Sequence, residues 1–392
     1  MIRDVSASAV CMGLLAAFVG YAASFAILLA GLTSVGATEA QAATGLFFTT
    51  LGMGICSIWL PAISRIPTAI TWSTPGAAFL ASTAALPGGF AEAVGALICC
   101  AVLIVITGLW PPLGRAVAAI PKPIANALLA GVLLKLCFAP AIALGVIPWL
   151  VLSLLLAWVV GLTWHKLAAT PLAVLAFVVT LAVTVDAPAG AAIAGQSWLP
   201  PMAPLMPEFT LRGLISLALP LYLVTMAGQN IPGFAVLELH GYPVERRPLM
   251  RKTGLVSLLI APFGAIPLNM SAITAAMMCG EDAGPDASRR YWAAIVSGLS
   301  LVTLALFAGP IAALTSLAPS EMITAVAGLA LIPALVASLS GAFSEPGQIE
   351  APALTFLLAA SGMTLIGVSG AFWGLVAGSA IWFLKRATGR RR

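Results

Sequence analysis

ITWSTPGAAFL, residues 70–80, is the stretch of this sequence that decides its fold. Pro75 suits the first turn of a helix because it lacks an N–H group, and Thr74 just before it is a good N-cap. Residues that precede a proline disfavour the helical region, so 72–74 should be extended. The stretch therefore predicts an extended segment that leads into a half-helix starting near Thr74.

A second stretch, GAIPLNMSAITAAMM, residues 264–278, repeats this pattern far along the chain. Pro267 is followed by two residues that could cap a helix, Asn269 and Ser271, and then by a short run of good helix formers. The chain thus contains a matched pair of interrupted segments.

Two half-helices whose N-termini meet inside a bilayer form a site of free N–H groups and positive dipole ends. Such a site binds an anion without a buried cation. The alternative is that both stretches are ordinary loop-to-helix boundaries at the membrane surface, and the residues alone leave both interpretations open.

Composition supports the membrane setting. The 392 residues are 61% hydrophobic and only 8% charged, whereas a soluble domain carries about 25% charged residues. Long runs rich in Leu and Ala, such as 150–160 and 354–365, favour helices over the alternating strands of a barrel. We therefore expect an all-α, polytopic membrane protein, with the apolar N-terminal stretch as an uncleaved first span.

We expect about fourteen transmembrane segments, of which the third and tenth are broken. Their expected bounds are 6–33, 43–62, 68–86, 89–110, 117–138, 141–163, 167–186, 212–238, 252–267, 268–283, 291–316, 320–340, 350–367 and 369–385. With both termini in the cytoplasm, sixteen of the eighteen Lys and Arg residues lie on the inner side, and only Lys135 and Arg212 lie outside. The net charge of +5 is then a topology signal and no indication of nucleic-acid binding.

The longest polar stretch divides the chain into two halves. Residues 1–186 form a first repeat, 187–211 an outer linker and 212–392 a second repeat. Because each half holds seven segments, the second half is inverted relative to the first. Inverted repeats with broken helices at the midplane are typical of secondary transporters.

Polar side chains inside two spans are further candidates for the site. Gln229 and Asn230 lie mid-span beside Pro232, which we expect to break that helix, and Tyr21 occupies the corresponding place in the first span. The alternatives are an interhelical hydrogen bond for the two amides and ordinary packing for the tyrosine, whose ring and hydroxyl also suit a planar ligand.

Few residues offer other chemistry. Among the acids at span ends, Glu238 is the best candidate for a proton carrier, because it lies on the same span as Gln229. Two histidines near span ends and six scattered cysteines argue against a metal site or an intramembrane enzyme. We expect no cofactor, and the absence of a GxxxxGK[ST] motif argues against ATP drive within the chain.

WSTPGA at 72–77, NMSAITAA at 269–276, GY at 20–21 and AGQNIPG at 227–233 together resemble the benzoate:proton symporter family over essentially the whole chain. The resemblance implies the seven-plus-seven inverted-repeat fold shared with nucleobase and sulfate-type anion transporters, in which the third and tenth segments each contain a short strand before a half-helix. Spans 1–4 and 8–11 would form a core domain, and spans 5–7 and 12–14 a gate domain. Relatives of this fold are often homodimers with an elevator-like motion.

The resemblance also implies that substrate lies between the two broken segments and span eight. The substrate-binding candidates are then Tyr21, Thr74, Pro75, Gly76, Ala77, Phe79, Gln229, Asn230, Asn269, Ser271 and Ala272. Nucleobase relatives have acidic residues where this chain has neutral amides. That change suits a carboxylate substrate but leaves the route of the proton open.

The implied function is import of benzoate or a similar aromatic carboxylate with protons across a bacterial-type inner membrane. The alternatives are the same fold carrying a nucleobase or another small anion, and an anion channel, since channels also contain broken helices.

Overall fold

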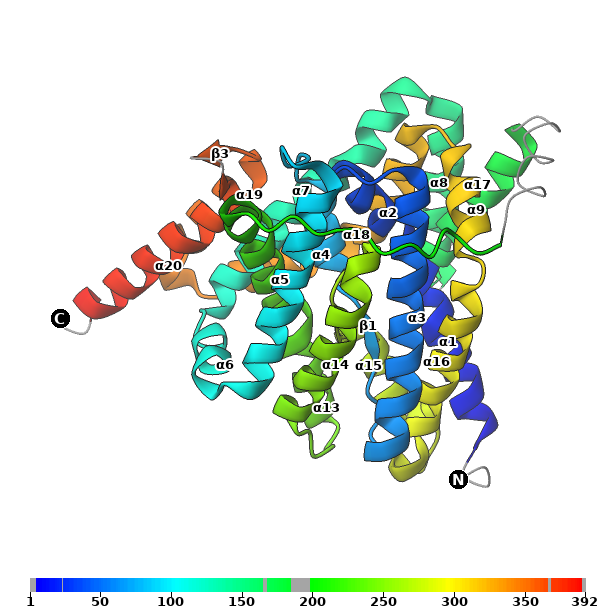
Figure 1. Cartoon of the computed structure of the whole chain (residues 1–392), viewed down its shortest axis with the longest axis horizontal. Helices are drawn as coiled ribbons and strands as arrows, with labels where there is room; N and C mark the ends of the chain where they lie inside the picture. The colour runs from blue at the N-terminus through cyan, green and yellow to red at the C-terminus, as the bar shows by residue number, and fades with distance from the viewer. Residues whose placement is uncertain (1–4, 23, 165–167, 185–197, 366–367, 390–392) are drawn as a thin grey trace.

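The computed structural model describes the chain except for residues 1–4, 23, 165–167, 185–197, 366–367 and 390–392. Helices dominate the described residues (Figure 1). The elements of the first half are α1 (Ala7–Ala22), α2 (Phe25–Ser34), α3 (Glu39–Ser64), β1 (Ile70–Trp72), α4 (Thr74–Ala81), α5 (Gly89–Leu109), α6 (Pro111–Ala118), α7 (Lys122–Val146), α8 (Pro148–Trp164) and α9 (Ala169–Thr184).

The second half begins with a long helix whose pieces are α11 (Leu211–Gly213), η2 (Leu214–Ala218), α12 (Leu219–Thr225), η3 (Met226–Asn230) and α13 (Ile231–Leu239). It continues with α14 (Arg246–Ile260), η4 (Ala261–Phe263), β2 (Leu268–Met270), α15 (Ala272–Cys279), η5 (Glu281–Ala283), η6 (Ala287–Arg289), α16 (Tyr291–Ala305), α17 (Ala308–Ser316), α18 (Ser320–Ala342), η7 (Pro346–Gln348), α19 (Glu350–Ser361), β3 (Thr364–Leu365), β4 (Val368–Ser369) and α20 (Gly370–Gly389).

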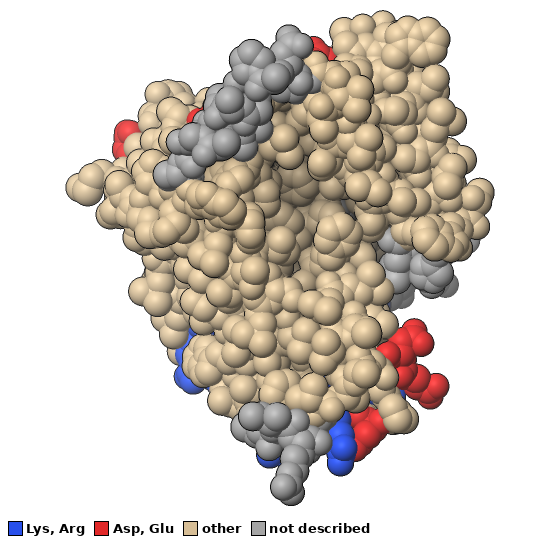
Figure 2. Space-filling view, turned by 90° about the vertical axis from the view of Figure 1, so that its right-hand side faces the viewer, with Lys and Arg blue, Asp and Glu red and all other residues tan. Residues whose placement is uncertain are grey.

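The expected polytopic character is confirmed, and the count of fourteen segments stays a prediction. Six helices in the described part of the chain are long and apolar enough to cross a bilayer, or up to seven if a bent pair counts as one span. Three shorter apolar helices, α8, α9 and α19, accompany them. Figure 2 shows a broad middle band without charged side chains, as a lipid-facing surface requires.

Several expected spans have different ends. The expected span 117–138 is wrong, because α6 and α7 are separate helices and α7 continues through Pro140 to Val146. The helix passes Pro140 where that ring packs against Gly328 of α18. Lys135, expected near an outer span end, therefore lies well inside α7.

Other spans are interrupted where a single helix was expected. The expected span 291–316 is bent by 62° between its two helices, whereas the expected first span, 6–33, agrees with one candidate span over Ala7–Ser34. The expected span 350–367 ends at Ser361, because Gly362 has a left-handed backbone with φ 64°, and the β3–β4 hairpin that follows was not anticipated. The expected break at Pro232 is wrong, because the π-helical turn η3 carries the helix past it.

Small residues allow the main helix pairs to approach closely. At Gly54 of α3 an added Cβ would lie 2.9 Å from the Gly298 carbonyl of α16, and at Gly108 of α5 it would lie 2.6 Å from the backbone of Arg251 in α14. Helix α7 packs along α18 and α19. Close packing of small residues is how apolar helices associate in lipid.

Residues 198–210 form an extended strap that crosses the upper part of the molecule before α11, drawn as a green trace in Figure 1. Its backbone is held by Thr44 of α3, which donates to the Pro201 carbonyl at 2.8 Å, and by the Pro262 carbonyl, which accepts from Leu205 N–H at 2.7 Å. Glu208 N–H donates to the Ala91 carbonyl of α5 at 2.9 Å. The end of the predicted first repeat at residue 186 and much of the linker lie outside the described residues.

Candidate functional site

Two short half-helices, α4 and α15, lie at the centre of the molecule. Ser73 caps α4, since its Oγ accepts from Gly76 N–H at 2.9 Å. The expectation that Thr74 is the cap is wrong: Thr74 is already helical, and the extended backbone of Ser73 lets its hydroxyl reach past Pro75 to the next free N–H. Ser271 caps α15 by accepting from Thr274 N–H at 3.4 Å.

The strands before the half-helices pair with each other. β1 and β2 are antiparallel, with Ile70 opposite Met270 and Trp72 opposite Leu268. These four side chains are at most 1% exposed. The interpretation as surface loop-to-helix boundaries therefore does not fit. The strand pair is only about 7 Å long, and the half-helices follow from its opposite ends, so their N-termini, with free N–H groups and positive dipole ends, flank the pair.

Hydroxyl groups from the flanking helices bind the strand pair. Ser57 of α3 donates to the Ile70 carbonyl at 3.2 Å, and Ser257 of α14 accepts from Leu268 N–H at 2.9 Å. Thr49 of α3 accepts from Ile266 N–H at 3.1 Å. Sequence reasoning missed these three residues, although hydroxyl side chains within apolar spans were a usable signal.

The two candidate asparagines are fully buried and bound to the protein itself. Asn230 is 1% exposed and its Oδ1 accepts from Met270 N–H at 3.0 Å. With the amide of Asn269 oriented to satisfy both of its ends, its oxygen accepts from Ser73 N–H at 2.8 Å and its nitrogen donates to the Met270 carbonyl at 2.9 Å. Both amides therefore fix the strand pair and the cap of α4.

The remaining candidates differ in how far they are buried. Thr74, Gln229 and Ala272 are half-buried, whereas Ser271 and the α4 residues Pro75, Gly76, Ala77 and Phe79 are buried. At Gly228 an added Cβ would lie 3.3 Å from the ring of Pro75 and 3.5 Å from the side chain of Leu129 in α7. Helix α7 thus packs directly against the candidate site.

Tyr21 packs in an aromatic cluster. Its ring is 5% exposed, stacks on Phe25 with centroids 5.7 Å apart and contacts Trp72 at 5.5 Å. Its buried hydroxyl has no hydrogen-bond partner within the described part of the chain. Trp72 is fixed in turn by donating to Ser24 Oγ at 2.8 Å. The aromatic cluster forms one wall of the centre.

Glu238, the candidate proton carrier, is at the far end of α13. It is exposed, and its carboxylate accepts from Arg246 at 2.8 and 2.6 Å. This geometry is that of an ion pair at a helix end. A search of the described residues found no cluster of His, Cys, Asp and Glu able to hold a metal ion.

The model of a protein family described as benzoate membrane transport protein matches residues 3–384. The chain belongs to that family. The benzoate membrane transport protein of Acinetobacter baylyi is 31% identical over 391 residues, which is 97% of this chain and 96% of the relative. Inner membrane protein YdcO of Escherichia coli is 36% identical over 373 residues, 94% of both chains. Like its family, the chain is a membrane transporter and not an enzyme.

Solved structures share the fold of this member of the benzoate transport family. The transmembrane domain of the cyanobacterial bicarbonate transporter BicA matches with a TM-score of 0.63 at 16% identity, covering 96% of this chain and 98% of that domain. The murine anion transporter Slc26a9 in its inward-facing state matches with a TM-score of 0.64 at 13% identity, covering 99% of this chain and 69% of the other.

Proposed function

We propose that the chain is a secondary active transporter that imports benzoate or a similar aromatic carboxylate together with protons. The observation that supports the proposal is the placement of two capped half-helices at the opposite ends of one short, buried strand pair, with Thr74, Gln229 and Ala272 half-buried. Free N–H groups there suit a carboxylate, and the aromatic wall at Tyr21 suits a ring. The name of the Acinetobacter relative supports the same substrate.

The proposal extends to an inverted repeat in a bacterial-type inner membrane, with both termini cytoplasmic. On the face in Figure 2, Lys and Arg side chains lie only toward the lower end, which supports that orientation. In an elevator-like cycle the core, spans 1–4 and 8–11, would move against the gate, spans 5–7 and 12–14. A homodimer joined through the gate fits such a motion.

The proton has two candidate routes. Glu238 stays a proposed carrier, although its exposed pairing with Arg246 gives that role little support. Alternatively the substrate carries the proton as the neutral acid, since an ordinary carboxyl group has a pKa of about 4.

Two other functions remain to be separated from this one. A bicarbonate transporter among the similar structures favours a second candidate, the same fold carrying another small anion; the neutral amides at 229, 230 and 269 disfavour a nucleobase. An anion channel would use the same N–H groups without coupling.

The test is uptake of labelled benzoate into proteoliposomes with an inward proton gradient, with sulfate, bicarbonate and nucleobases as competitors. We expect benzoate to accumulate above equilibrium. An uncoupler should abolish this accumulation, and among the competitors only aromatic acids should inhibit it. Uncoupler-insensitive equilibration would indicate a channel. No uptake by protein that elutes as a single folded species would overturn the substrate assignment.

A further inference from the structure

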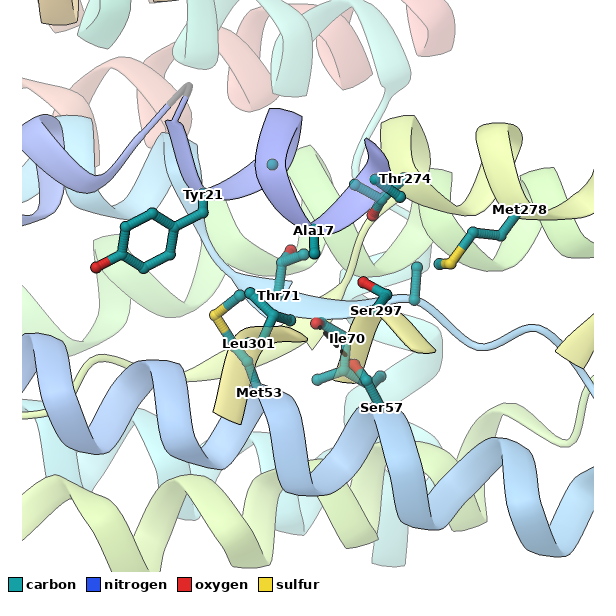
Figure 3. A pocket seen from close by; sticks show the side chains of 13 residues that line it. Ala17, Tyr21, Met53, Ser57, Ile70, Thr71, Thr274, Met278, Ser297 and Leu301 are labelled. Atoms are coloured by element: carbon teal, nitrogen blue, oxygen red, sulfur yellow. Dashed lines mark hydrogen bonds between the residues drawn. The ribbon is translucent and has the colours of Figure 1, made fainter. Parts of the chain in front are cut away.

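A small cavity lies between α15, β1 and α16 (Figure 3), and its mostly apolar lining includes several hydroxyl side chains. Its walls come from α1, α3, β1 and the residue before it, α15 and α16. Its volume is ≈ 10 Å³, about the space that one buried water molecule needs. The cavity is therefore too small for an aromatic acid.

Thr274 of α15 presents an unsatisfied group to this cavity. Its side chain is 5% exposed, and its Oγ1 has no hydrogen-bond partner among the described residues. The hydroxyls of Thr274 and Ser297 both lie at the cavity, whereas the Tyr21 hydroxyl points away from it (Figure 3). Burying a hydroxyl without a partner is unfavourable. A polar molecule in the cavity would supply the missing hydrogen-bond partner of Thr274.

Ser57 supplies a third hydroxyl, and Thr71 of β1 also lines the cavity. Ser57 of α3 donates its proton to the Ile70 carbonyl at 3.2 Å, which leaves its oxygen able to accept. Buried waters typically make about three hydrogen bonds to groups that otherwise lack partners. Three hydroxyls from three helices match that requirement, while a lining of neutral side chains does not offset the cost of burying a cation.

We propose that the cavity binds one ordered water, which accepts from Thr274 and exchanges hydrogen bonds with Ser57 and Ser297. Thr274 is also the residue whose N–H is bound by the cap Ser271. The water therefore connects the first turn of α15 to α16 and, through Ser57, to the carbonyl of β1. It holds one half-helix of the site in place, and its binding does not depend on which substrate is carried.

The test compares two nearly isosteric substitutions in the full-length protein in lipid nanodiscs. Thr274→Val removes a partner of the water. Thr68→Val is the matched control, because Thr68 is 0% exposed, its hydroxyl also lacks a partner, and it does not line the cavity. The readouts are density at the cavity in a structure at high resolution, and the Tm of each variant.

We expect water density bonded to the three hydroxyls in the wild type and its loss in Thr274→Val. Tm should fall by about 2–4 °C in Thr274→Val and stay level or rise in Thr68→Val. Ser297→Ala should weaken the density independently, should Thr274→Val not fold. An empty cavity at that resolution, equal Tm changes in both Val variants, or density that disappears when sodium is replaced by choline would each overturn the proposal.

Discussion

At the residue scale, the structure separates a buried amide that binds the strand pair from one that stays half-buried. Asn269 satisfies the buried Ser73 N–H and the Met270 carbonyl, whereas Gln229 of η3 is half-buried. Asn269→Ala should leave a buried N–H without a partner and cost about 1–3 kcal/mol. Gln229→Ala should keep its stability and lose affinity for substrate.

Thermal unfolding and uptake kinetics of the two variants check this contrast. We expect a lower Tm for Asn269→Ala, and a raised KM at unchanged Tm for Gln229→Ala. If Gln229→Ala instead lowers the Tm and Asn269→Ala does not, Gln229 is the positioning residue and our assignment of the two amides is reversed.

At the element scale, the packing of the strap, residues 198–210, against α5 should require a glycine at position 95. A Cβ there would clash with the Glu208 carbonyl oxygen, which is backbone and cannot rotate away. Gly95→Ala should therefore displace the strap from α5 and destabilise the protein by about 1–3 kcal/mol.

Limited proteolysis and thermal unfolding measure the effect at Gly95. Cleavage within 198–210 should become faster and Tm should fall. Gly145→Ala is the control, because nothing lies within 4 Å of its added Cβ, and it should leave both unchanged. A strap equally resistant in both variants would contradict the tight seating on α5.

Elements governed by local chemistry could be predicted from the sequence. The proline and capping patterns predicted both half-helices and the extended backbone before the first, because caps and proline effects act over a few residues. The strand before the second half-helix was implied only by the family resemblance. The choice of Ser73 over Thr74 was missed, because either hydroxyl can cap and only the final backbone decides. The extent of α7 past Pro140, the bend between α16 and α17, and the β3–β4 hairpin depend on packing against distant helices, which no local pattern encodes.

The candidate site was predictable only in part for the same reason. Thr74, Gln229 and Ala272 could be named from their segments. Asn230 and Asn269 instead hydrogen-bond to the backbone of the strand pair. These bonds depend on contacts between distant segments, such as Asn269 with Ser73. The supporting hydroxyls of Ser57 and Ser257 look like ordinary polar residues of apolar helices until β1 and β2 are brought together.

At the scale of the whole molecule, an elevator-like cycle requires the contact between α7 and the site to break. Leu129 of α7 packs on Gly228 of η3, which joins the proposed gate to the proposed core. In a background without the six native cysteines, a short bifunctional thiol reagent on Leu129→Cys with Gly228→Cys should abolish uptake.

A second pair supplies the control within the gate. An added Cβ at Gly341 of α18 would lie 3.6 Å from the Cβ of Asn126 in α7, a separation typical of linked cysteines. Cross-linking Asn126→Cys with Gly341→Cys joins two helices that should move together, so uptake should persist. Loss of uptake from both pairs would indicate motion within the gate, and loss from neither would exclude sliding of the core past α7. Either result would replace the elevator-like cycle with a different mode of alternating access.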